Sequence, residues 1–263
     1  MTFKREHAIQ NALARLASDH AVRILYACES GSRAWGFASR DSDYDVRFLY
    51  ARKVEDYLTL KPHRDVIEHM QDDLDLAGWD IFKACKLLAK SNPPLLEWLG
   101  SPIVYLEGGG FAEGLRTQAQ KWFSCRACCE HYLSMTRSNF SDHVDGREKV
   151  VRKKYLYVLR PLACVRWLLV HGAFPPTPFI DVLDGIQLPP EVRADVGRLL
   201  ADKRANREMG IAGRIPSIGS FLQAELDGLP EKVAGIPGRR FRLEGLNELI
   251  SSTLLGRSSG GTR

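Results

Sequence analysis

Three aspartates at alternate positions, Asp41, Asp43 and Asp45, mark the stretch SGSRAWGFASRDSDYDVRFLY. Carboxylates crowded in this way repel one another, and a fold tolerates the repulsion most readily where a cation lies between them. The apolar residues that follow Asp45 predict a strand that enters the core, where a charge needs a partner. An Asp-rich surface loop or a capped turn is the alternative interpretation.

Ten residues separate the pair Gly31–Ser32 from Asp43, and the pair closely follows an apolar run that ends at Cys28. Backbone N–H groups at a turn between a strand and a helix point the same way and favour an anion. Glycine lets a phosphate approach the backbone closely, and the Ser32 hydroxyl could donate to a phosphate oxygen. Because turns contain many such pairs, this pair alone is weak support for a phosphate site.

Alternation along the strand places Asp43, Asp45 and Arg47 on one face and the intervening apolar side chains on the other. The two carboxylates would then lie roughly 5–7 Å apart. Two divalent cations about 3.5–4 Å apart fit between such carboxylates and a triphosphate. One cation would orient a pyrophosphate leaving group, and the other would lower the pKa of an attacking hydroxyl. Arg47 could instead serve to offset the carboxylate charge.

Predicted helices and strands surround these residues. Periodicity in the first part of the chain predicts a helix near residues 7–17, a short helix at 54–60 and two more at 77–90 and 92–99, with Asn92 as a cap. Strands are predicted at residues 21–28, 43–50, 64–70, 72–76 and 101–108. We therefore expect a small mixed sheet with flanking helices.

The pattern changes after the triplet Gly108–Gly110. Helical periodicity dominates from there, and the residues from Leu115 to about Asn139 predict one continuous helix. Further helices are predicted at residues 146–171, 190–207, 216–228 and 242–255. The predicted fold class is thus α+β, with a mixed-sheet domain at 1–108, an all-helical domain at 109–256 and a disordered tail at 257–263.

Charge and cysteine content narrow the classes of protein. The net charge is only +5, but Arg147 to Arg166 holds seven basic residues and one acidic residue, which suits a helix that faces phosphates or one that is merely solvated. No apolar run approaches a membrane span, and the start of the chain carries no leader pattern, so we expect a cytoplasmic protein. The six cysteines lie in apolar patterns and are expected to be buried free thiols.

Together these residues resemble a known family. Gly31–Ser32, ten spacer residues and DYDV are similar to the signature of the DNA polymerase β-type nucleotidyltransferase superfamily. Three longer blocks resemble the nucleotidyltransferases associated with RNA-repair systems: SGSRAWGFASRDSDYDVRFLY, DLDLAGWDIFKACKLLAKSNPPLLEWLGSPIVY and KKYLYVLRPLACVRWLL. The resemblance runs from about Tyr26 to Pro178. The short signature is moderately specific, and the combination of blocks is highly specific.

The resemblance implies roles for particular residues. Asp43 and Asp45 match the first two metal carboxylates, and Gly31 and Ser32 match the phosphate-binding pair, with Arg33 as a further nucleotide-binding candidate. A third metal carboxylate should lie on a later strand. Asp75 is our choice, because Leu74 and Leu76 flank it in a strand-like pattern. Asp73, Glu68 and Asp80 are alternatives, and Asp80 could instead cap the start of a helix.

Lys149, Lys153, Tyr157 and Arg160 are expected on one helix face. The resemblance implies that a helix after the catalytic domain binds the triphosphate and nucleoside, and we assign Lys149, Lys153 and Tyr157 to that role. The alternative is that the basic residues only solvate an exposed face.

The predicted function is transfer of a nucleoside monophosphate from an NTP, with ATP as first choice, to a hydroxyl group. The predicted cofactor is Mg²⁺, as two ions, with Mn²⁺ as a substitute. The family context suggests an RNA 3′ end, such as a damaged tRNA, as acceptor. A protein or small-molecule acceptor, and an inactive module that binds nucleotide or RNA, are the alternatives. The sequence leaves the oligomeric state open.

Overall fold

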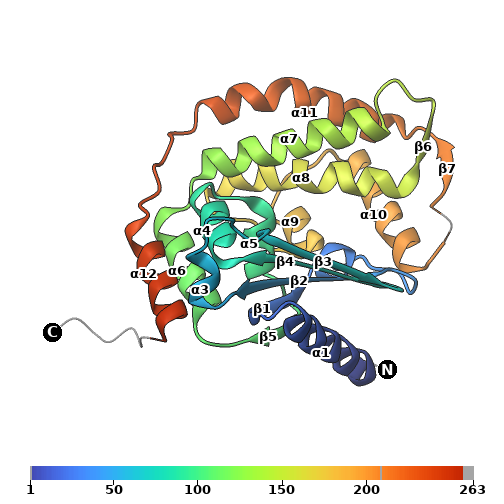
Figure 1. Ribbon diagram of the computed structural model, residues 1–263. Helices are drawn as coiled ribbons and strands as arrows, with labels where there is room; N and C mark the ends of the chain where they lie inside the picture. The colour runs from blue at the N-terminus through green and yellow to red at the C-terminus, as the bar shows by residue number, and fades with distance from the viewer. Residues whose placement is uncertain (1, 208, 257–263) are drawn as a thin grey trace. The chain divides into compact units, whose positions relative to one another are not determined.

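The computed structural model describes residues 2–207 and 209–256 (Figure 1). The chain forms two compact units, neither of them continuous in sequence. The sheet unit holds the residues up to Gly31, Asp43–Phe123 and the residues from Arg240 onward, and the helical unit holds Ser32–Ser42 and Ser124–Arg239. This division differs from the expected boundary near residue 108, because α6 (Phe111–Trp122) and α12 (Glu244–Leu255) belong to the sheet unit, and the spacer 32–42 belongs to the helical unit. The tail predicted at 257–263 lies outside the described residues.

A five-stranded mixed sheet forms the centre of the sheet unit. Its strands are β1 (Arg23–Glu29), β2 (Tyr44–Ala51), β3 (Val66–Gln71), β4 (Leu74–Asp80) and β5 (Val104–Glu107). They lie in the order β3-β4-β2-β1-β5, and only β2 and β4 run parallel to each other. The expected α+β class with a small mixed sheet is confirmed.

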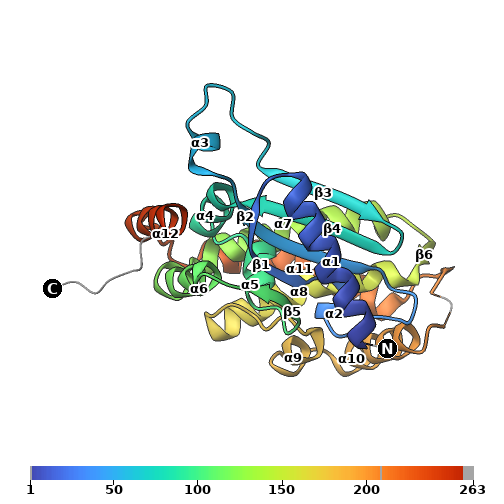
Figure 2. The ribbon, with the colours of Figure 1, turned by 60° about the horizontal axis from the view of Figure 1, so that its bottom comes forward.

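Helix α1 (Thr2–Asp19) covers one face of this sheet, as Figure 2 shows. Its apolar residues Ile9, Leu13 and Leu16 belong to the same buried core cluster as Val46 and Phe48 of β2. Burial of these side chains supplies the main stabilisation of this layer. It also fixes the alternation of β2, so that Asp45 and Arg47 project from the opposite face, as predicted.

Helices α4 (Ile81–Ala89), α5 (Pro93–Leu99) and α6 (Phe111–Trp122) pack against that opposite face, and α12 (Glu244–Leu255) packs on α4 and α6. Asp80 caps α4 by accepting from the N–H of Phe82, and Asn92 caps α5 by accepting from the N–H of Leu95. The predicted helix at 77–90 therefore begins late, because Ala77–Asp80 continue β4. The short α3 (Val54–Tyr57) follows β2.

The helical unit is built on α7 (Cys125–His143) and α8 (Arg152–His171), which lie side by side in Figure 1. Helix α11 (Pro216–Ala234) packs on both, and α9 (Phe179–Asp184) and α10 (Pro190–Arg204) pack on α8. Helix α8 continues on both sides of Pro161. The short α2 (Gly31–Ala34) spans the point where the chain passes from the sheet unit to the helical unit.

Two expectations for this region are wrong. The continuous helix from Leu115 to about Asn139 is interrupted after Trp122, because Ser124 caps a new helix by accepting from the N–H of Ala127. The region is also not all-helical, since β6 (Lys149–Val151) pairs with β7 (Ile211–Gly213).

All six cysteines are free, and five of them are buried, as expected. Burial raises the pKa of the Cys28 and Cys85 thiols to about 12, so both remain protonated at neutral pH. Among the helices of the described part of the chain, none is long and apolar enough to cross a membrane.

Gly78 permits the close packing of β4 on β2. A Cβ placed on Gly78 would lie 2.1 Å from Cε2 of the buried Phe48 ring. We expect Gly78→Ala to lower the free energy of unfolding by about 1–3 kcal/mol, because the ring has to shift. Urea denaturation followed by circular dichroism measures this change.

Gly197, exposed within α10 and with no atom within 4 Å of an added Cβ, provides the control. Gly197→Ala should be neutral or stabilise the protein by roughly 0.5–1 kcal/mol, since alanine favours helix. Equal effects of the two substitutions would contradict the packing described for Phe48.

Candidate active site

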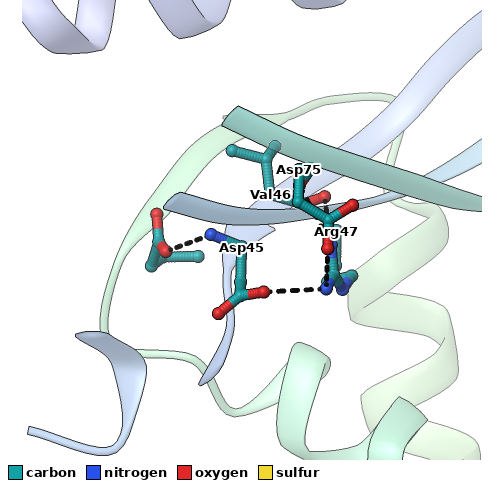
Figure 3. A network of polar contacts seen from close by, with 5 residues as sticks. Asp45, Val46, Arg47 and Asp75 are labelled. Atoms are coloured by element: carbon teal, nitrogen blue, oxygen red, sulfur yellow. Dashed lines mark hydrogen bonds and ion pairs between the residues drawn. The ribbon is translucent and has the colours of Figure 1, made fainter. Parts of the chain in front are cut away.

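Asp45 and Asp75 face each other across the one parallel strand pair of the sheet. They are register partners on β2 and β4, which brings their side chains to the same face. Nη2 of Arg47 donates to Oδ1 of Asp45 at 2.9 Å and to Oδ2 of Asp75 at 2.8 Å (Figure 3). The structure thus brings together two of the three predicted acids and gives Arg47 the charge-offsetting contacts expected of it.

The environment makes the Asp45 carboxylate costly to ionise. Burial is the largest cause that raises the pKa of Asp45, and the nearby charges of Asp75 and Asp43 raise it further. Arg47 acts in the opposite direction without cancelling the other effects. Asp43 itself is exposed and lies one residue before β2. The three acids therefore act on one another electrostatically, as their spacing predicts.

Asp75 is also the candidate that the geometry favours as the third acid. Among the alternatives, Asp73 forms an ion pair with Arg5 of α1, on the other face of the sheet. Glu68 of β3 pairs with Arg64, which lies just before that strand. Asp80 lies five residues beyond Asp75, about 17 Å further along β4, where it caps α4 and accepts from Tyr57.

Gly31 contacts the Asp45 carboxylate directly. Its φ is +56°, and a Cβ built on it would lie 1.9 Å from Oδ2 of Asp45. The adjacent N–H of Ser30 donates to the carbonyl oxygen of Asp45 at 2.8 Å. A side chain at position 31 would be strained and would displace Asp45. Glycine is therefore needed here whether or not a phosphate binds the turn.

Glu29 is a residue that the sequence analysis missed. It is fully buried at the end of β1, and its Oε1 accepts from the N–H of Asp45 at 2.8 Å. Its Oε2 accepts from the hydroxyl of Tyr105 on β5. The available signal was an acid that ends the apolar run RILYACE directly before the Gly-Ser turn.

Ser32 and Arg33 belong to the helical unit and are held within the spacer 32–42. Ser32 is buried, and its carbonyl oxygen accepts from the N–H of Phe37. Arg33 donates to the carbonyl oxygen of Ser42 at 2.6 Å. The end of α10 also binds the spacer, because Arg204 donates to the carbonyl oxygen of Gly36.

Lys149, Lys153 and Tyr157 also belong to the helical unit, but they do not share one helix face with Arg160. Lys149 lies on β6, because α8 begins only at Arg152. Lys153 and Tyr157 are exposed one turn apart on α8.

Arg160 is buried, in contrast to the exposed Lys153 and Tyr157, and its guanidinium lies 4.3 Å from the centre of the Trp35 ring. The edge of Tyr157 meets the same ring. Trp35 thus packs against α8 from within the spacer.

The donors at the acid pair suit a hard divalent cation. Within residues 2–207 and 209–256, no three His, Cys, Asp or Glu side chains are arranged so that they could hold a metal ion by themselves. Mg²⁺, however, is commonly bound by one or two carboxylates together with substrate phosphates and water. Asp45 and Asp75 meet that requirement, and a cation would relieve the unfavourable ionisation of Asp45.

Comparison with known proteins gives three findings. Residues 5–252 match the family model RlaP, described as the RNA repair pathway DNA polymerase beta family. The chain is 41% identical over 248 residues to the uncharacterized protein YcgL of Bacillus subtilis strain 168, covering 94% of this chain and 95% of that protein.

Among solved structures, a nucleotidyltransferase-like protein from Exiguobacterium sibiricum 255-15 is 13% identical, with a TM-score of 0.30 over 97% of this chain and 82% of that one. That structural likeness is too weak to add to the assignment. The family match spans nearly the whole chain and includes every residue of the acid pair and the glycine turn. The chain therefore belongs to the RNA repair pathway DNA polymerase beta family.

Proposed function

We propose that this protein is a metal-dependent nucleotidyltransferase that uses an NTP, with ATP as the first candidate, and acts in the cytoplasm on an RNA 3′ end. The acceptor oxygen forms a bond to the α-phosphorus, and the bond from that phosphorus to the oxygen bridging to the β-phosphate breaks. Pyrophosphate leaves, and the hydroxyl proton passes to a carboxylate or to water. Membership of an RNA-repair family supports RNA as the acceptor.

One observation carries this proposal: Asp45 and Asp75 lie opposite each other on parallel strands, with burial opposing the ionisation of Asp45. Such a pair lowers the stability of the folded protein, and groups held at such a cost are typical of functional sites. Two divalent ions, when bound, would neutralise phosphate charge and lower the pKa of the attacking hydroxyl. Asp45 and Asp75 would hold them, Asp43 would add a ligand at the start of β2, and Asp75 would accept the hydroxyl proton.

For nucleotide binding we propose the residues assigned from the sequence. Gly31, Ser32 and Arg33 are proposed to bind the phosphates. Lys153 and Tyr157, which are exposed one turn apart on α8, are proposed to bind the triphosphate and the nucleoside, together with Lys149. Arginine and lysine donors suit phosphate oxygens, and an exposed tyrosine ring suits a base.

Loss of one carboxylate of the pair should abolish turnover. We expect wild-type protein with Mg²⁺ and α-labelled ATP to label RNA and release pyrophosphate. Asp45→Asn and Asp75→Asn should each lower the rate by at least about 100-fold. Loss of either carboxylate weakens the binding of the cations that stabilise the negative charge of the transition state. Asp73→Asn, two residues from Asp75 but paired with Arg5 on the other face, should keep wild-type activity.

The outcomes separate the alternatives. Label on polypeptide but not on RNA would show that the acceptor is a protein and not RNA. An Asp45→Asn variant as active as wild type would refute the role of the acid pair. Absence of pyrophosphate release by wild-type protein with any of the four NTPs would favour a binding module without catalysis.

The acid pair should also carry a measurable stability cost. Because the folded-state pKa of Asp45 is raised, its contribution to stability is present in acid and is lost as the pH rises through that pKa. An asparagine side chain does not ionise, so the variant does not lose this stability as the pH rises. In metal-free buffer at pH 7 we expect Asp45→Asn to raise Tm by about 1–3 °C, with the gain shrinking as the pH falls.

Asp195 provides a control of opposite sign, because hydrogen bonds from Ser217 and Arg198 lower its pKa. Asp195→Asn should lower Tm at pH 7, and this loss should shrink as the pH falls. Calorimetry measures both variants, and an Asp45→Asn variant that melts below wild type at pH 7 would contradict the cost assigned to the pair.

A further inference from the structure

The carboxylate of Glu29 is buried next to the backbone of the acid pair rather than next to its side chains. Glu29 is the register partner of Val46, whose side chain lies in the core on the α1 side of the sheet. Partnered residues of adjacent strands point to the same face. The Glu29 side chain therefore lies on the α1 side, and Asp45 projects from the other face.

The hydrogen bond from Asp45 to Glu29 replaces a missing strand contact. The N–H and C=O of Asp45 both point toward β1, as those of one strand residue do. The carbonyl oxygen accepts from the N–H of Ser30, but the chain then turns away at Gly31, whose φ is +56°. Where the strand would otherwise supply an acceptor, Oε1 of Glu29 accepts from the N–H of Asp45 at 2.8 Å.

Both the side chain and the backbone of Glu29 are held by hydrogen bonds. The Tyr105 hydroxyl of β5 donates to Oε2 of Glu29, and the Ser101 hydroxyl donates to the Glu29 carbonyl oxygen at 2.6 Å. The Glu29 N–H donates to the carbonyl oxygen of Ile103. A fully buried carboxyl group with these donors is fixed in position, because moving it would leave buried polar atoms without partners.

We propose that Glu29 is a positioning residue that fixes Asp45 for metal binding, an inference that rests on the proposed function. Glu29 and Ser30 hold the backbone of Asp45 at its N–H and C=O, and Gly31 leaves room for its carboxylate. Arg47 orients that carboxylate toward Asp75. Without the Glu29 contact, the first residues of β2 are no longer held to the end of β1 by the N–H of Asp45. The Asp45 carboxylate then loses its fixed direction.

Asp80 is a matched control for the burial of an acid. It is a buried carboxylate on the same sheet that also accepts from one backbone N–H, that of Phe82, and from one tyrosine hydroxyl, that of Tyr57. It lies at the far end of β4 from Asp75. A purely structural role for Glu29 predicts that Glu29→Ala and Asp80→Ala behave alike.

The test measures Mn²⁺ binding by electron paramagnetic resonance on the full chain, without substrate. Wild-type protein should bind Mn²⁺. Glu29→Ala should weaken binding about 10–100-fold, the usual effect of removing a group that orients a metal ligand. Glu29→Gln should stay within about threefold of wild type, because its amide oxygen accepts the same N–H. Asp80→Ala should lose stability yet bind Mn²⁺ like wild type.

A second readout does not depend on metal. The amide proton of Asp45, observed by NMR in the metal-free protein, should lie downfield in wild type and in Glu29→Gln and shift upfield in Glu29→Ala. It should be unchanged in Asp80→Ala. An unchanged Asp45 amide signal in Glu29→Ala would remove the contact on which the inference depends.

The possible failures are distinguishable. If wild type and Glu29→Ala bind Mn²⁺ equally and both release pyrophosphate, the role of Glu29 is refuted and the proposed function stands. If Asp80→Ala loses Mn²⁺ binding as much as Glu29→Ala does, the effect of Glu29 is only structural. If wild type neither binds Mn²⁺ nor releases pyrophosphate, the proposed function fails, and the role of Glu29 fails with it.

Discussion

The mutual repulsion of Asp45 and Asp75 is the constraint on which the rest of the site depends. Parallel pairing of β2 and β4 places them as register partners, so the fold brings two like charges together instead of separating them. A single guanidinium, that of Arg47, contacts both. Since burial still raises the pKa of Asp45, one arginine does not balance the charges, and the surrounding backbone has to hold the acids in place.

That backbone is held by residues on the opposite side of the sheet. The apolar face of α1 fixes which side chains of β2 turn inward, and Glu29 ties the N–H of Asp45 to the end of β1. Gly31, which has no side chain, then lets the chain leave the strand close beside the carboxylate without a clash. In this structure the glycine of the Gly-Ser turn has a steric role that is independent of any bound phosphate.

The sequence was sufficient for features that depend on local pattern. Alternation in β2 predicted the faces of Asp45 and Arg47, and apolar neighbours on both sides singled out Asp75 among four acids. Periodicity could not separate Ala77–Asp80 from the helix that follows, because an apolar run fits both elements until Asp80 caps the helix. The break at Ser124 was missed for a similar reason, since a cap inside a periodic stretch is a weak signal.

Features that depend on distant pairing were beyond the sequence pattern. Lys149 was placed on a helix because its spacing fits one, whereas its strand partner lies more than 60 residues away, at Gly213. Glu29 was missed because its partners, Asp45 and Tyr105, become neighbours only when three strands form one sheet. The catalytic roles of the acids and of the nucleotide-binding residues remain predictions.

The position of α12 in the sheet unit has a consequence for how the chain folds during translation. Leu249 of α12 fills the space beside Gly114 of α6, and Arg23 of β1 donates to the carbonyl oxygen of Thr253. The layer started by the first strands is therefore finished by residues that are translated 230 positions after Arg23. Until those residues emerge, the nascent sheet unit exposes an uncovered apolar surface that is a natural target for chaperones.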